Sequence, residues 1–177
     1  MPPLPQTVRP EAGEYDPYYG RYIALVPDGD VVGALAGQLA HTIAPLRRLT
    51  DEDARQAYAP GKWTIAEVIG HVCDVERVMA YRALRIARGD TTPLAGFDEN
   101  AYTPAGEFDA RPFVSLLDEL EQVRRATVAL LAGLPASAWT RTGTVNAGPV
   151  SVRALAWIIA GHERHHSGLF RERYGVV

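Results

Sequence analysis

Apolar residues recur every three or four positions in four long segments of the chain, as they do on one face of an amphipathic helix. These segments cover residues of about 30–44, 64–87, 112–132 and 151–174. Asp30 is a good N-cap for the first segment, and Pro45 is expected to end or kink that helix. Thr64 and Glu67 form a Thr-x-x-Glu capping box at the start of the second segment. Four such helices without an alternating strand pattern predict an all-α four-helix bundle.

The connections between these helices carry weaker patterns. Residues 51–58 predict a short helical turn before the breaker at Pro60. Residues 91–109 predict a loop, which is long for a compact domain, and loops of that length often carry function. Pro112 is expected at the first position of the third helix. Residues 140–149 predict a turn-rich connector without helical character.

The first 29 residues are rich in Pro, Gly and Tyr and show no sustained periodicity. We interpret residues 1–29 as an irregular lead-in and residues 30–177 as the bundle domain. The lead-in contains too many aromatic residues for a disordered tail, so we expect it to pack on the bundle or to line the mouth of a site. Its aromatic cluster consists of Tyr15, Tyr18, Tyr19 and Tyr22.

Composition excludes two classes of partner. Hydrophobic residues make up 47% of the chain and charged residues 22%, and no stretch approaches the roughly 18–20 apolar residues that a membrane helix needs. The net charge is −3, and the short basic pairs Arg47-Arg48 and Arg124-Arg125 are interpreted as solvated surface. We therefore expect neither a membrane nor a nucleic acid as partner.

Two further features favour a cytoplasmic location. The start of the chain lacks the charged and apolar regions of a signal peptide. Cys73 is the single cysteine, which excludes an internal disulfide and fits a reducing compartment. Cys73 itself is interpreted as a small buried residue.

Three histidines lie where metal chemistry is feasible. His162 and His166 are four residues apart, so they share one face of the fourth helix, and that face is the apolar one. His71 lies on the second helix, and inward-facing residues of two helices can meet inside a bundle. Three neutral imidazoles would hold one divalent metal ion and leave a position for water. The alternative is one core histidine with an internal hydrogen bond and a second histidine that reaches solvent.

Polar residues near His71 are the candidates for catalytic or supporting roles. Glu67 and Asp74 lie one turn away on either side of His71, and both carboxylates could orient its ring. The alternative is that Glu67 only caps the helix and Asp74 only forms a salt bridge. Arg82 could tune the site from the same helix. His165 lies about 60° around the fourth helix from His162 and could replace either ligand, although a supporting or interface role is favoured.

The segment 162–166 also matches the His-Glu-x-x-His pattern of zinc proteases, in which Glu163 would be the general base. We reject this interpretation, since only 11 residues follow His166 and a distant third ligand has no room. Leu169 and Glu172 stand where the metzincin continuation requires glycine and histidine. The match is therefore interpreted as coincidental.

Two motifs resemble those of the DinB/YfiT-like superfamily, bacterial four-helix bundles with a three-histidine metal site. They are Gly61-Lys62-Trp63-Thr64-Ile65-Ala66-Glu67-Val68-Ile69-Gly70-His71 and Ala160-Gly161-His162-Glu163-Arg164-His165-His166. The resemblance covers residues of about 30–174 and implies metal ligands at His71, His162 and His166, with zinc or nickel as the ion. Characterised members include thiol-dependent S-transferases and a mycothiol-dependent maleylpyruvate isomerase.

This resemblance leads to one main functional hypothesis and two alternatives. The main hypothesis is a metal-dependent enzyme, a thiol S-transferase or hydrolase in type, which acts on a small electrophilic molecule and can use a low-molecular-weight thiol. The first alternative is a non-enzymatic, stress-associated bundle that binds a metal or a small ligand. The second is a dimerisation module with a vestigial site, and a homodimer is a candidate assembly in each case.

Overall fold

Four long helices form the bundle in the computed structural model, which describes residues 5–176. Residues 1–4 of the expected lead-in, and residue 177, lie outside the described part. The long helices are α2 (Val31–Leu46), α4 (Ile65–Ala87), α6 (Phe113–Ala132) and α7 (Val152–Tyr174). The predicted all-α four-helix bundle is confirmed. No helix within residues 5–176 combines the length and apolar character that a membrane span requires.

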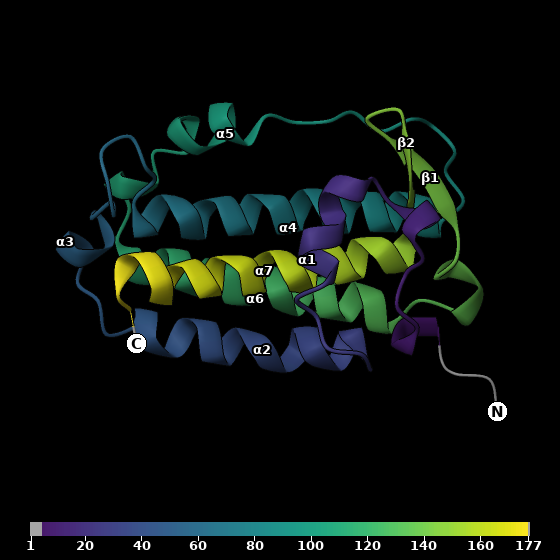
Figure 1. Cartoon of the computed structure of the whole chain (residues 1–177), viewed down its shortest axis with the longest axis horizontal. Helices are drawn as coiled ribbons and strands as arrows, with labels where there is room; N and C mark the ends of the chain where they lie inside the picture. Colours follow the sequence, from purple (N-terminus) through teal and green to yellow (C-terminus); the bar gives the residue numbers. More distant parts are fainter. Residues whose placement is uncertain (1–4, 177) are drawn as a thin grey trace.

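The four helices pack as a square in which α4 contacts α6 and α7, and α2 contacts the same two helices. Figure 1 shows that α4 and α6 run in one direction and α2 and α7 in the other. Because α4 and α6 are parallel, the chain between them must return along the whole bundle. Residues 88–112 make this crossover and pass over one face of the molecule (Figure 1).

Side chains cap the helices at the residues that the sequence indicates. The Asp30 carboxylate accepts a hydrogen bond from the Val32 amide, and Thr64 and Glu67 form both bonds of the capping box. Pro45 stands in the last turn of α2, which ends one residue later. Pro112 differs from the prediction, since it is the N-cap of α6 and not its first residue.

Two predicted connections have more structure than the sequence indicated. The expected loop 91–109 contains a short helix, and the expected connector 140–149 forms an antiparallel hairpin. The hairpin turn is made by Asn146 and Ala147, both with positive φ, as a two-residue turn between twisted strands requires. The helix predicted over 51–58 is shorter, Asp51–Ala54.

The smaller elements comprise short α-helices, 3-10 turns and two strands. The short α-helices and strands are α1 (Gly20–Ile23), α3 (Asp51–Ala54), α5 (Glu99–Ala105), β1 (Thr142–Val145) and β2 (Gly148–Ser151). The 3-10 turns are Pro5–Thr7, Ala12–Glu14, Pro17–Tyr19, Phe108–Ala110 and Ala136–Ala138.

Ion pairs and carbonyl contacts fasten the described part of the lead-in to the bundle. Arg9 donates to the carbonyls of Ile23 and Val26 at 2.8 and 2.7 Å, and its guanidinium stacks over the Trp157 ring at 4.6 Å. Glu14 accepts hydrogen bonds from the side chains of Ser151 and Arg153 at the start of α7. These contacts hold α1 across α7, where Figure 1 shows it in front of the bundle.

The core consists of two apolar clusters with a polar layer between them. One cluster holds Leu35, Met79 and Leu155, and the other holds Leu39, Leu117 and Phe170. Every long helix contributes polar side chains to the level between these clusters. The polar layer consists of Gln38, Thr42, His71, Glu76, Arg124, Thr127, His162, Glu163 and His166.

Arg124 joins all four helices within this layer. Its guanidinium donates two hydrogen bonds to Glu76 on α4, at 2.9 and 2.8 Å, and one to Glu163 on α7, at 2.6 Å. It also donates to the Leu35 carbonyl of α2 at 3.1 Å. The interpretation of Arg124 as solvated surface was therefore wrong, since the side chain is only 3% exposed. Its neighbour Arg125, at 72%, does face solvent.

Removal of the Arg124 side-chain charge should lower the free energy of unfolding of the protein. Arg124→Met leaves the carboxylates of Glu76 and Glu163 buried without a cation, and breaking such a buried pair typically costs about 3–5 kcal/mol. Arg125→Met is the matched control, and its free energy of unfolding should change by less than about 0.5 kcal/mol. Urea denaturation followed by circular dichroism measures both values. Equal effects of the two substitutions would show that the network does not hold the bundle together.

Candidate metal centre

The rings of His71, His162 and His166 meet inside the bundle. The Nε2 atom of His162 lies 3.1 Å from Nε2 of His71 and 3.2 Å from Nε2 of His166. One ring nitrogen of each residue falls within 4.8 Å of the other two. The three side chains are 6–7% exposed, so the cluster is shielded from bulk water. Helices α4 and α7, which pack closely along their length, therefore bring the three predicted ligands together.

These distances fit a metal ion held by three imidazoles. Nitrogen ligands lie about 2.0–2.1 Å from a zinc ion, so two ligands of a tetrahedral site are separated by about 3.3 Å. The nitrogens of His71 and His166 approach that of His162 at close to this separation. Three nitrogen donors also leave the fourth position of a tetrahedral ion to another group. The donor set suits zinc and nickel alike.

The histidines are present as neutral rings at pH 7. Burial lowers the pKa of His71 to about 4, with a further contribution from His165. Burial, reinforced by the neighbouring histidines, lowers the pKa values of His162 and His166 well below their ordinary range. A neutral imidazole offers one lone pair, which is the form that binds a metal.

Two glycines permit the close packing around this cluster. Gly161 precedes His162, and a Cβ atom at this position would overlap the backbone carbonyl of Tyr22 in α1. Gly70 precedes His71, and a Cβ atom there would overlap the Phe108 ring. Because neither glycine has a side chain, the Tyr22 backbone and the Phe108 ring can approach the helix next to a histidine of the cluster. Both glycines belong to the motifs that carry the family resemblance.

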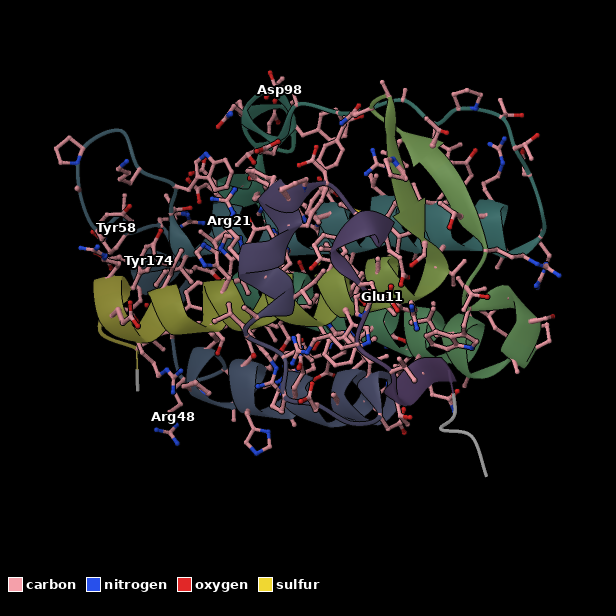
Figure 2. The ribbon with its side chains drawn as sticks, turned by 45° about the vertical axis from the view of Figure 1, so that its right-hand side comes forward. Glu11, Arg21, Arg48, Tyr58, Asp98 and Tyr174 are labelled. Carbon is pink, nitrogen blue, oxygen red and sulfur yellow. The ribbon has the colours of Figure 1, made fainter. Side chains whose placement is uncertain are left out.

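Aromatic rings form the walls around the histidines. The Tyr22 ring lies edge-on to His162, with centroids 5.3 Å apart, and Trp63 packs on His71 at 4.8 Å. The Tyr174 hydroxyl, at the end of α7, donates to the Trp63 carbonyl at 2.7 Å, and this hydrogen bond connects α7 to the segment before α4. Figure 2 shows Tyr174 next to Tyr58 at this end, with ring centroids 5.1 Å apart.

A cavity of about 540 Å³ opens onto the histidine cluster. Its walls come from the lead-in, α4, the crossover, the hairpin and α7. Tyr18 and Tyr19, which were expected to pack on the bundle or to line the mouth of a site, line it, as do Phe97 and Glu99 of the crossover. Apolar and polar side chains line it together, which suits an organic molecule of modest size that carries polar groups.

The predicted supporting residues have different positions. Glu67 accepts from the Thr64 amide at 2.8 Å, and Asp74 lies 3.7 Å from Arg77. Among the described residues neither carboxylate has a hydrogen bond to His71, and a catalytic role for either stays a prediction. Arg82 lines the cavity, and so does His165, whose ring lies 5.1 Å from that of His166.

Glu163 and Cys73 are not available as nucleophile or base. The Glu163 carboxylate is turned into the bundle, where Thr42, Gln38 and Arg124 donate to it at 2.6 Å each. This geometry agrees with the rejection of a His-Glu-x-x-His protease. Cys73 is buried, and burial raises the pKa of its thiol to about 12, so it is not a reactive thiolate.

Sequence reasoning missed the part of the cavity that the hairpin supplies. Val145, Asn146, Pro149 and Val150 line the cavity from this element. The strands contain four residues each, too few for an alternating pattern to stand out. Asn146 was the available signal, since Asn is common at turn positions with positive φ.

Comparisons with known proteins agree on the family and the fold. A family model described as the DinB superfamily matches residues 34–170. An Oceanobacillus iheyensis protein with the provisional name of a metal-dependent hydrolase is 25% identical over 149 residues, which are 78% of this chain and 86% of that protein.

Two solved structures share the architecture. YfiT from Bacillus subtilis, described as a probable metal-dependent hydrolase with an unusual four-helix bundle topology, superposes with a TM-score of 0.68 at 19% identity. That match covers 94% of this chain and 97% of the other. A mycothiol-dependent maleylpyruvate isomerase gives a TM-score of 0.70 at 15% identity, over 88% of this chain and 63% of the isomerase.

A methyl group at Gly161 should disturb the packing of α1 over the site. Alanine normally stabilises a helix interior by about 0.5–1 kcal/mol relative to glycine. Gly168→Ala in the same helix, where a Cβ meets no atom within 4 Å, should show this gain. Gly161→Ala should instead lower the free energy of unfolding by about 1–3 kcal/mol, because the methyl overlaps the Tyr22 carbonyl. Thermal denaturation of both variants measures the difference, and a gain for Gly161→Ala would contradict the close packing.

The metal-free protein should lose stability as the pH falls from 7 to 5. In the unfolded chain histidine has a pKa near 6.5, whereas burial lowers that of His71 to about 4, so the unfolded state binds more protons between these values. For His71 alone this costs on the order of 2 kcal/mol at pH 5. Melting temperatures in the presence of a chelator should therefore fall less steeply for His71→Gln than for wild type. His41→Gln, on the exposed side of α2, should keep the wild-type slope.

Proposed function

Because this chain belongs to the DinB superfamily, we propose that it is a metal-dependent enzyme that acts on a small electrophilic molecule. The close approach of three neutral histidine nitrogens to one another, at the wall of a cavity, is the observation that carries the proposal. The provisional name of the Oceanobacillus iheyensis relative supports hydrolysis as the reaction class. Thiol transfer is the second class, supported by the shared fold of the mycothiol-dependent isomerase.

His71, His162 and His166 would hold the ion through one nitrogen each. A divalent ion bound there lowers the pKa of water or of a thiol and so supplies a nucleophile at neutral pH. The rings of Tyr22 and Trp63 exclude bulk water from this point, which strengthens electrostatic interactions with a bound molecule. The ion pair to Arg124 keeps Glu163 in the bundle interior and fixes the rotation of α7 that aims His162 at α4.

Metal content tests whether the histidine cluster is a metal centre. Protein purified without a histidine tag or added metal should carry about one zinc or nickel ion per chain by elemental analysis, since the cluster offers three ligands. His71→Ala and His162→Ala should lose the ion, whereas His41→Ala and His165→Ala should keep it. A wild-type protein that takes up neither zinc nor nickel when they are offered would refute the metal centre.

Turnover tests whether the protein is an enzyme that acts on small electrophilic molecules. Metal-loaded protein should hydrolyse p-nitrophenyl acetate, or transfer cysteine to 1-chloro-2,4-dinitrobenzene, with at least a tenfold lower kcat/KM in His162→Ala. Activity without thiol identifies a hydrolase, and activity only with thiol identifies a transferase. A full metal complement without turnover, together with a large fall in melting temperature on chelation, would favour the non-enzymatic alternative.

A further inference from the structure

Arg82 is the one buried arginine in the described residues without an acidic partner. Three arginine side chains are buried there, Arg82 at 2% exposure, Arg124 at 3% and Arg153 at 9%. Arg124 pairs with Glu76 and Glu163, and Arg153 pairs with Glu14. Within residues 5–176 no carboxylate oxygen lies within 4.0 Å of the Arg82 guanidinium.

The contacts that Arg82 does make leave part of its guanidinium free. One NH2 group donates to the Ala95 carbonyl at 2.8 Å, and the other faces the Met79 sulfur at 3.5 Å, a weak acceptor. The Tyr19 hydroxyl also accepts a hydrogen bond from Arg82, and the Phe97 ring lies 5.6 Å from its central carbon. These neighbours are neutral. A guanidinium carries five N–H donors and always a positive charge, so this set neither saturates nor neutralises it.

Arg82 shares the cavity with the histidine cluster. It stands eleven residues after His71 on α4, which is close to three helical turns, so both side chains lie on the same face. The contact with Met79 shows that the guanidinium folds back toward His71, to a level about 12 Å from His71 along the helix axis. Val75 and Met79 make an apolar floor between the two ends.

A buried cation without a counterion is costly, and proteins usually pair it with an acid. Asp16 and Glu99 are the acidic residues that line the same cavity, and both lie beyond salt-bridge distance of Arg82. Arg82 lines this cavity, so the donors that no neighbour occupies can meet a ligand there. A planar guanidinium binds a carboxylate through two parallel hydrogen bonds.

We propose that Arg82 binds the carboxylate of an organic acid whose apolar, aromatic-sized body lies along Val75 and Met79 toward the histidine cluster. The proposal deepens the proposed function, on which it rests, by naming the substrate class as small carboxylates. Arg82 is then a substrate-binding residue that fixes which end of the molecule faces the metal centre.

Binding of matched acid and amide pairs tests this assignment separately from turnover. The probes are benzoate, 3-phenylpropanoate and 5-phenylpentanoate, each compared with its neutral amide by isothermal titration to metal-loaded protein. For at least one pair the acid should bind wild type tenfold or more tightly than the amide. Arg82→Gln should reduce this preference to less than threefold, and Arg82→Lys should keep part of it. Arg88→Gln replaces an exposed arginine at the C-cap of the same helix; it is the matched control and should bind as wild type does.

A direct bond between the carboxylate and the metal would give a different result. In that case the acid preference would survive Arg82→Gln and vanish in metal-free His71→Ala, which would overturn the proposal. Equal binding of acid and amide by wild type for all three pairs would overturn it as well. Preference that depends on Arg82, in a protein without turnover, would leave this proposal standing while the proposed function fails.

The melting temperature supplies an independent readout. If Arg82 serves a ligand, Arg82→Met should leave the ligand-free protein equally or more stable, because an unneutralised buried charge is removed. If Arg82 instead serves the fold through its bond to Ala95, the same substitution should lower the melting temperature, and this outcome contradicts a binding role.

Discussion

The guanidinium of Arg124 is the contact that sets the positions of all four long helices relative to one another. It reaches from α6 to Glu76 on α4, to Glu163 on α7 and to a backbone carbonyl on α2. Burial alone would lower the pKa of Arg124, but the two carboxylates outweigh this effect and raise it. Because Glu163 directly follows His162, the bond that satisfies the carboxylate also determines the rotation of α7, and with it the direction of the histidines. Removing one member of such a network is costly, whereas replacing all members by well-packed apolar residues is often neutral.

The polar layer contains two arrangements with opposite chemistry. In the ion network each acceptor of Glu163 faces a donor, from Thr42, Gln38 or Arg124, so the group is fully satisfied. In the histidine cluster three similar rings face one another, and their buried nitrogens compete for the same protons. Among the described residues, Nδ1 of His166 is one of two buried side-chain polar atoms without a hydrogen-bond partner, and Nε1 of Trp157 is the other. The unsatisfied cluster beside the ion network is therefore what a ligand site is expected to look like.

Local signals made the helices and the histidine cluster predictable. Caps, breakers and the four-residue spacing of His162 and His166 act within one or two turns of the chain. Arg124 was misjudged because its partner Glu76 lies 48 residues away. Its spacing from Leu117, Leu120 and Leu131 nevertheless places it on the apolar stripe of α6. The hairpin escaped detection because its strands are short and are fixed partly by contact with Leu94 of the distant crossover.

The two ends of the cavity are built from different parts of the fold, the long helices at one end and connecting segments at the other. The histidines lie on α4 and α7, which the hydrogen bonds of Arg124 connect. Sequence changes in the surface loops are therefore expected to leave the distances between the histidines unchanged. The surroundings of Arg82 come instead from connecting segments, with Ala95 and Phe97 from the crossover and Tyr19 from the lead-in. Connecting segments vary more readily than packed helices. Relatives at 15–25% identity can thus share one helical framework while the connecting segments around the far end of the cavity differ.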